Sequence, residues 1–318
     1  MLKSLKPLID KSRKGYARAT SRLISLSEDE PLMREKIVKD LYKFCGKAHI
    51  IGVTGSPGAG KSTLVDRLAI NFAKKGAKVA IIAVDPSSPF SGGAILGDRI
   101  RMSGIQGFPE IFVRSMASRG ALGGLSHATL SAVYILEAAG YDYIFIETVG
   151  VGQGEVDIAR FAQTCLVVLV PGMGDEVQSV KAGILEIADI FVINKAEREG
   201  ASTLERDILT LISLVEYEKS AWKASVSKTT ATKDIGVRDL CERILKHRTW
   251  LESSDTAEIK KSQVMESTLL QLASERTRIA VKLKSEKLLK RLSQLCLKRK
   301  TDPYSASLKL IKSLKSSI

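Results

Sequence analysis

No other stretch of this chain limits the possible folds as strongly as GVTGSPGAGKST, residues 52–63. Residues 55–62 match the pattern G-x-x-x-x-G-K-[ST], and they lie between the β-rich run HIIGVT and a helical stretch that begins near Lys61. In that context glycines let backbone N–H groups converge on phosphate oxygens, and the helix N-terminus adds positive potential. The sequence therefore predicts a nucleoside-triphosphate site in a P-loop fold.

The residue types of this loop fit the chemistry of a triphosphate. Lys61 is expected to neutralise the β and γ oxygens and to act as a catalytic residue, and the Ser62 hydroxyl can ligate Mg²⁺. The phosphate-binding residues that we expect in the loop are Gly55, Gly58, Ala59, Gly60, Lys61, Ser62 and Thr63.

Around the loop, short β-rich runs alternate with helix-length segments. Seven such runs are present: HIIGVT, KVAIIAV, EIFVRS, DYIFIET, CLVVLV, DIFVIN and KASVS. Strands that alternate with helices form a largely parallel sheet with helices on both faces. We therefore predict an α/β, doubly wound P-loop domain over residues 48–251.

Helical segments flank this domain at both ends. Residues 1–47 show apolar residues at helical spacing, and Asp29-Glu30-Pro31 is typical of a helix start. After residue 251 the chain reads as basic helices, for example IAVKLKSEKLLKRLSQLCLKRK. We predict an N-terminal helical extension over 1–47 and a C-terminal helical arm over 252–318.

Charge and composition narrow the class of protein. The formal net charge is +14, and residues 252–318 hold 15 Lys and Arg against 7 Asp and Glu. Nucleic acid is one possible partner of such a tail, but no aromatic residues interleave the basic ones to stack on bases. The four cysteines are scattered without a zinc or disulfide pattern. Because no run is apolar enough for a membrane span or a secretory signal, we expect a cytoplasmic protein.

Acidic residues at strand ends are candidates to hold the metal of a phosphoryl-transfer site. Asp85 ends the second β-rich run, Asp98 follows thirteen residues later, and Glu147 ends another run. Gly150 lies three residues after Glu147, where a P-loop protein needs a backbone N–H that faces the γ-phosphate. We therefore predict Ser62, Asp85, Asp98 and Glu147 as Mg²⁺ ligands, and Glu147 also as a catalytic residue.

The stretch IFVINKAEREG, residues 190–200, is a candidate for recognition of the base. A carboxylate such as Glu197 can accept two hydrogen bonds from guanine that adenine does not offer, and the stem of Lys195 can cover the base beside Asn194. Further along, Ser227-Lys228 follow a short β-rich run, where a second loop usually closes over the base. These features favour GTP over ATP.

Taken together, these motifs resemble the MeaB/ArgK/MMAA-type GTPases. GVTGSPGAGKST, VDPSSPFSGGAILGDRIRM, VRSMASRGALGGLS, IETVGVGQGEVDIA and PGMGDEVQSVKAGILEIADIFVINKAE follow that family in wording, order and spacing. The resemblance covers roughly residues 15–250, and the segment TDPYSASLKLI is also similar to the family's terminal segment. Glu197 stands where the family usually has Asp, and the C-terminal region is unusually rich in lysine.

The resemblance implies a chaperone that binds and hydrolyses GTP and assists and protects an adenosylcobalamin-dependent acyl-CoA mutase, methylmalonyl-CoA mutase above all. It implies that the protein gates cofactor loading and release, that Lys181 contacts nucleotide or partner, and that the C-terminal arm forms a homodimer. Val151 follows Gly150, where small GTPases carry the glutamine that orients water, so we expect slow hydrolysis without a partner.

Two other classes stay open from the residues alone. A P-loop defines phosphate chemistry and not the acceptor, so an ATP-dependent kinase or a transport-associated ATPase is an alternative. A basic arm that binds nucleic acid is a further one, and it predicts affinity that falls steeply with salt.

Overall fold

A computed structural model describes residues 5–85, 103–105, 107–117, 127–148, 161–172, 187–215, 221–254 and 256–315. The chain forms two compact units, Met1–Thr256 and Ala257–Ile318.

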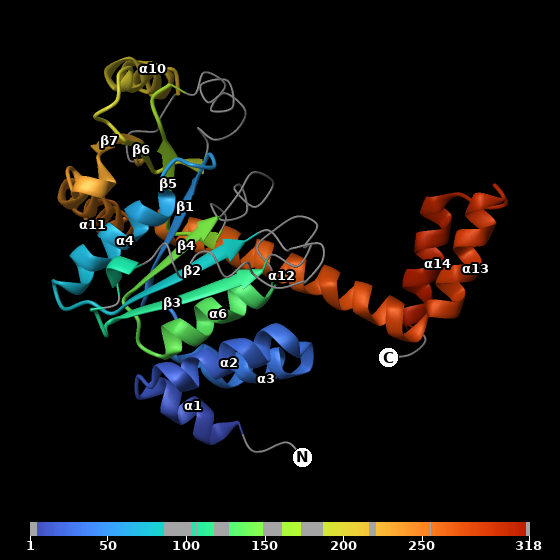
Figure 1. Cartoon of the computed structure of the whole chain (residues 1–318). Helices are drawn as coiled ribbons and strands as arrows, with labels where there is room; N and C mark the ends of the chain where they lie inside the picture. The colour runs from blue at the N-terminus through green and yellow to red at the C-terminus, as the bar shows by residue number, and fades with distance from the viewer. Residues whose placement is uncertain are drawn as a thin grey trace. The chain divides into compact units, whose positions relative to one another are not determined.

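The first unit is built on a sheet of seven parallel strands in the order β3-β2-β4-β1-β5-β6-β7 (Figure 1). The strands are β1 His49–Gly55, β2 Val79–Asp85, β3 Ile111–Ala117, β4 Tyr143–Thr148, β5 Thr164–Leu169, β6 Ile190–Asn194 and β7 Ser225–Thr229. Each of the seven β-rich runs forms one of these strands, so the predicted α/β parallel sheet is confirmed.

Helices cover both faces of the sheet. On one face α4 (Lys61–Ala73) and α11 (Val237–Ser253) pack against alternate strand residues in one apolar core. On the other face α10 (Ala201–Ser213) packs against β5 and β6, and α6 (His127–Ala138) lies against β2 and β4. Burial on both faces explains why the central strands read as continuous apolar runs rather than as alternating ones.

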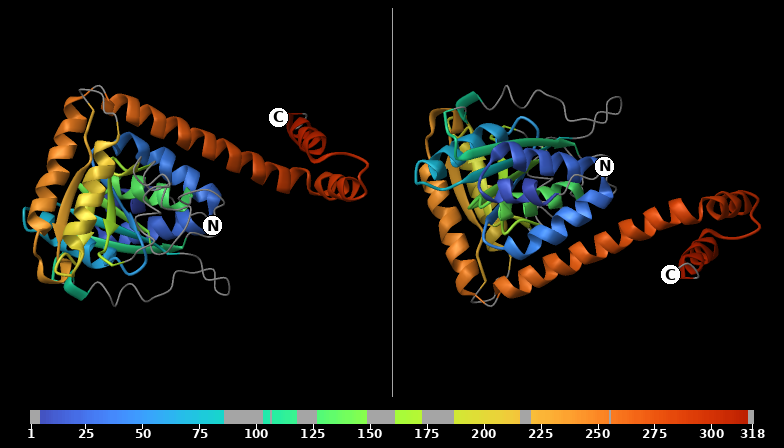
Figure 2. Two further views of the ribbon diagram at one scale, coloured as in Figure 1. Left: turned by 90° about the horizontal axis from the view of Figure 1, so that it is seen from above. Right: turned by 90° about the horizontal axis from the view of Figure 1, so that it is seen from below.

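The N-terminal helices form a further layer on α6. They are α1 Lys6–Arg13, α2 Ala17–Asp29 and α3 Pro31–Leu41, followed by the short 3₁₀ helix η1 Tyr42–Phe44. Both α2 and α3 contact α6, as the blue and green helices in Figure 2 show. Leu23 and Ile37 are fully buried there, and Arg114 of β3 pairs with Glu28 of α2 at 2.9 Å. The predicted N-terminal helical extension is therefore present and belongs to the same compact unit as the sheet.

The described part of the second unit consists of helices joined by short turns. It holds α12 (Thr256–Lys284), α13 (Glu286–Leu297) and α14 (Pro303–Lys315), and α13 and α14 contact each other. Several large apolar side chains are exposed in this unit: Ile259, Met265, Leu269, Leu270, Leu297, Tyr304, Leu308 and Ile311. None of the described helices combines the length and the apolar character needed to span a membrane.

Candidate functional site

The carboxyl ends of the parallel strands meet at one edge of the sheet, and the loop from β1 to α4 lies there. Gly55 ends β1 with φ +134°, and a Cβ at this position would come within 2.1 Å of the Val168 carbonyl oxygen on β5. Gly60 starts α4 with φ +84°, and its Cβ would come within 2.5 Å of Asn194 Nδ2. Only glycine fits at these two positions, because both the backbone conformation and the neighbouring atoms exclude a side chain. Gly58 also has a positive φ, +79°.

Lys61 and Ser62 open helix α4 directly behind this loop. Lys61 is buried, at 6% exposure, and its ammonium donates to the carbonyl oxygens of Gly55 at 2.5 Å and Ser56 at 3.0 Å. The lysine charge is therefore held inside the loop rather than in solvent. Ser62 and Thr63 are half-buried in the first turn of α4. This arrangement places one cation and the helix N-terminus at the same spot, as an anion site requires.

A carboxylate from β4 reaches the same helix end. The Ser62 hydroxyl donates to Glu147 Oε1 at 2.6 Å, and Glu147 is 1% exposed. A hydroxyl and a carboxylate are hard oxygen ligands, which Mg²⁺ prefers, so this pair fits the metal that the sequence analysis predicts. Asp85 is the last residue of β2, and its side chain lies outside the described part of the structure. Asp98, Gly150 and Lys181 lie outside the described residues.

Asp66 is a further acidic residue of this region that the sequence analysis missed. It lies one helical turn after Ser62 on α4, and it is 7% exposed. Its Oδ1 has no hydrogen-bond partner among the described residues. Burial, and after it the charge of Glu147, raises the pKa of Asp66 to about 7. The spacing from Ser62 was the available signal, because residues four apart share one face of a helix.

The pKa of Asp66 predicts how its amide variant depends on pH. The folded chain keeps the Asp66 proton up to about pH 7, whereas the unfolded chain releases it near 3.8, the ordinary pKa of an aspartate. The stability that this proton gives is therefore present at low pH and is lost as the pH rises through 7. We expect Asp66→Asn to raise the free energy of unfolding at pH 8 by about 1–2 kcal/mol, and the gain to shrink towards pH 5.

Urea unfolding at several pH values, without nucleotide or metal, measures this difference. Asp207→Asn is a matched control, because Asp207 is exposed on α10. A gain that is the same at pH 5 and pH 8 would contradict the expected pH dependence.

Asn194, at the end of β6, forms hydrogen bonds both with the phosphate loop and with the residues at and after the end of β7. Its Nδ2 donates to the Ala59 carbonyl oxygen at 2.8 Å, and its Oδ1 accepts from Thr229 Oγ1 at 3.1 Å and from the Ala231 backbone N–H at 3.2 Å. Asn194 is 2% exposed. One buried amide therefore fixes the distance between the phosphate loop and the segment after β7.

Lys195 and Glu197 follow in the loop after β6. Lys195 has φ +55°, unusual for a residue with a side chain, and its Nζ donates to the Gly58 carbonyl oxygen at 2.7 Å. Its side chain therefore crosses to the phosphate loop. Glu197 is exposed, and its Oε2 accepts from Thr230 Oγ1 at 2.7 Å. That hydrogen bond lowers the pKa of Glu197, which keeps the carboxylate ionised.

The position of Ser227 and Lys228 corrects the sequence analysis. We expected them in a loop after a short strand, but both lie within β7, paired with Val192 and Ile193 of β6. Ser227 is buried, and Lys228 pairs with Glu205 of α10 at 2.8 Å. The β-rich run KASVS continues to Thr229 because its residues complete the ladder with β6.

The residues that contact Asn194 and Glu197 come immediately afterwards: Thr229, Thr230 and Ala231. The sequence analysis missed them. After them, η4 (Ala231–Lys233) and an antiparallel bridge from Thr230 to Ile235 close the loop before α11. The Thr-Thr-Ala stretch after an apolar strand was the signal available in the sequence.

Comparison of the chain with known proteins shows which proteins it is similar to. A family model described as "Methylmalonyl Co-A mutase-associated GTPase MeaB" matches residues 20–286. A putative GTPase of Pyrococcus abyssi is 44% identical over 316 residues, 96% of each chain. The GTPase ArgK of Escherichia coli is 33% identical over 257 residues, 80% of this chain and 78% of the relative.

Solved structures show the same fold. The crystal structure of an LAO/AO transport system kinase has a TM-score of 0.71 over 98% of this chain and 97% of that one. The two sequences are 23% identical, so this likeness speaks for the fold alone.

Proposed function

The chain belongs to the family of methylmalonyl-CoA mutase-associated GTPases, and on this premise we propose that it is the GTP-dependent chaperone of an adenosylcobalamin-dependent acyl-CoA mutase. The members of this family are GTP hydrolases, and the family is described as associated with methylmalonyl-CoA mutase. That description is the observation that carries the proposal. In this role the protein gates the loading of intact cofactor into the mutase and the release of damaged cofactor. The alternative of an ATP-dependent kinase or transport ATPase has no comparable support.

The roles proposed for the phosphate end of the site follow from its contacts. Lys61 exchanges its carbonyl partners in the loop for the β and γ oxygens of GTP, and the backbone of Gly58, Ala59, Gly60 and Thr63 binds the same phosphates. Ser62 and Glu147, together with Asp85 and Asp98, would hold Mg²⁺. When bound, the metal neutralises charge on the phosphate oxygens.

The base end of the site is assigned on the same grounds. Glu197 accepts two hydrogen bonds from guanine in place of the one from Thr230, and the stem of Lys195 covers the base. Asn194 and the backbone of Ala231 keep the two loops together. Since the Glu197 carboxylate is exposed and ionised before the base arrives, it needs no proton transfer to recognise guanine.

Hydrolysis is proposed to be slow until a partner completes the site. Gly150, which would face the γ-phosphate, is followed by Val151, which has no group that can position water. Lys181 is our candidate for a residue that the partner brings into place.

The second unit is proposed to serve as a dimerisation arm. Its exposed apolar side chains, Leu269, Leu270 and Leu308 among them, are the kind of surface that another protein chain covers. A homodimer accounts for the basic helices without nucleic acid. The proposed location of the protein is the cytoplasm, with its client mutase.

Turnover of GTP in the presence of a purified adenosylcobalamin-dependent acyl-CoA mutase tests the proposal. We expect a rate for the chain alone far below about 10 per second, the typical rate of a metabolic enzyme, and a clear increase when the mutase is added. Co-purification from the native cell identifies the client. Fast turnover by the chain alone that the mutase does not change would refute the chaperone role.

A further inference from the structure

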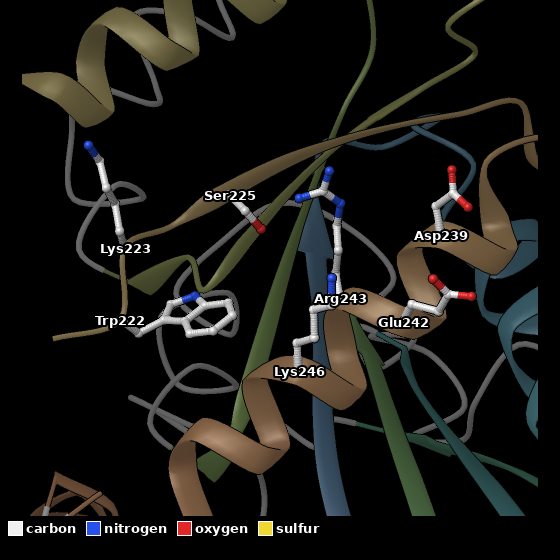
Figure 3. Close-up of a pocket in the computed structure, with 7 residues that line it drawn as sticks. All are labelled: Trp222, Lys223, Ser225, Asp239, Glu242, Arg243 and Lys246. Carbon is white, nitrogen blue, oxygen red and sulfur yellow. The ribbon is translucent and has the colours of Figure 1, made fainter. Parts of the chain in front are cut away.

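A pocket of about 320 Å³ lies beside the last strand of the sheet, between α11 and the start of β7 (Figure 3). Its lining residues are three cations (Lys223, Arg243 and Lys246), two acids (Asp239 and Glu242), Trp222 and Ser225. None of them belongs to the nucleotide site described above.

The sequence of α11 explains why a polar pocket forms there. Val237, Leu240 and Ile244 are fully buried against the sheet. Asp239, Glu242, Arg243 and Lys246 stand at i, i+3, i+4 and i+7, so they share a second face of the helix. Because β7 is the edge strand, no further strand of the described residues lies under this second face.

The pocket holds three cations against two acids, and two of its cations make no ion pair among the described residues. Arg243 and Lys246 make no ion pair or hydrogen bond with the part of the chain that the structure describes, whereas Glu242 pairs with Arg238 at 3.6 Å. The Ser225 hydroxyl oxygen is buried and has no hydrogen-bond partner among the described residues. Figure 3 shows Arg243 between Ser225 and Trp222 on one side and the two acids on the other. A buried hydroxyl normally has a hydrogen-bond partner, so the Ser225 hydroxyl is available to a ligand, beside the exposed side chains of Arg243 and Lys246.

Trp222 provides a fixed apolar wall. Its indole Nε1 donates to the Asp189 carbonyl oxygen at 2.9 Å, and its ring centroid lies 4.6 Å from that of the buried His247. His247 in turn stacks on Trp250, with ring centroids 5.6 Å apart. The wall is therefore in place before any ligand arrives.

We propose that this pocket binds a compact small molecule that carries one carboxylate or phosphate group. Arg243, Lys246 and Ser225 hold this anionic group, and the body of the molecule lies against Trp222. The guanidinium of arginine matches both kinds of anion through paired hydrogen bonds. The volume lies at the lower end of the range of small-molecule pockets. Asp239 and Glu242 disfavour a polyanion such as a nucleoside triphosphate by like-charge repulsion. This site is separate from the proposed chaperone function and does not depend on it.

Tryptophan fluorescence tests the site directly, because the chain has only two tryptophans. Trp250→Phe leaves Trp222 as the single reporter and keeps an aromatic ring against His247. Inorganic phosphate and succinate are titrated separately into this variant at constant ionic strength, with saturating Mg·GDP so that the phosphate loop is occupied. We expect the fluorescence of Trp222 to change in a saturable way, with half-saturation at a probe concentration on the order of 1 mM.

Matched variants decide the outcome. Arg243→Gln in the same background should raise the half-saturation at least about tenfold, whereas Arg206→Gln, which removes an exposed cation from α10, should leave it unchanged. A response to phosphate alone assigns a phosphate ester, and a response to succinate alone assigns a carboxylate. No saturable response to either probe, or an unchanged response in Arg243→Gln, overturns the proposal. Unchanged GDP affinity shows that Arg243→Gln is folded, and Lys246→Gln serves as the second variant.

Discussion

Replacing Lys61 with alanine should weaken binding of Mg·GTP at least about 100-fold. Lys61 is 6% exposed, and its ammonium is held by two carbonyl oxygens of the loop, so it meets the triphosphate with little water to displace. Hydrogen bonds to charged groups contribute about 1.5–3 kcal/mol each, and two of them correspond to a factor of about 100 or more in affinity. Calorimetric titration of the folded variant with Mg·GTP measures the loss.

A matched control is available on the same helix. Lys74 follows the last residue of α4 and is exposed, so Lys74→Ala removes an equal charge far from the loop. The affinity of Lys74→Ala for Mg·GTP should equal that of the parent chain. If Lys61→Ala bound GTP as tightly as Lys74→Ala, the proposed phosphate site would be wrong.

Replacing Glu197 with glutamine should lower the affinity for GTP about 100-fold and the affinity for ATP hardly at all. A carboxylate accepts from both N1–H and the 2-amino group of guanine, whereas an amide places a donor opposite one of these donors. In Glu197→Gln a donor of guanine and the donor of the amide are both left unpaired. Polar groups left unpaired in a binding site lower the affinity strongly. Competition of GTP and ATP for a fluorescent GDP analogue gives both affinities.

Glu199→Gln controls for the loss of charge, because Glu199 is exposed two residues further along the same loop. It should bind GTP like the parent chain. Equal losses for GTP and ATP in Glu197→Gln would indicate that Glu197 supports the loop and does not read the base.

Much of the fold and of the phosphate site was predictable from local sequence. The strands β4, β5 and β6 are apolar runs that are buried throughout, and the glycine positions follow from the backbone conformation that the loop needs. Four residues of the site lie close to such runs in the chain: Lys61, Ser62, Asn194 and Lys195. Strand ends of a parallel sheet converge at one edge, so their order along the sequence was enough to bring these residues together.

The remaining contacts depend on register and on packing between distant segments. A strand that extends two residues further than expected placed Lys228 against Glu205 and moved the loop contacts to Thr229, Thr230 and Ala231. Nothing local marks such an extension, because polar residues tolerate an edge strand as well as a loop.

Two histidines give a second example. His49 and His247 lie far apart in the sequence, and both have a ring nitrogen 2.7 Å from the hydroxyl oxygen of Thr164. A hydroxyl has one hydrogen to donate, so at least one of the two imidazoles donates to the Thr164 oxygen. Only the pairing of β1 with β5, and the packing of α11 on them, brings the three together.

The most direct test of the account is calorimetric titration of the parent chain with Mg·GTP and, separately, with Mg·ATP. The account predicts one GTP site per chain and an affinity for ATP at least about tenfold weaker, because the carboxylate of Glu197 finds no matching donors on adenine. Equal or tighter binding of ATP, or no binding of GTP, would contradict it.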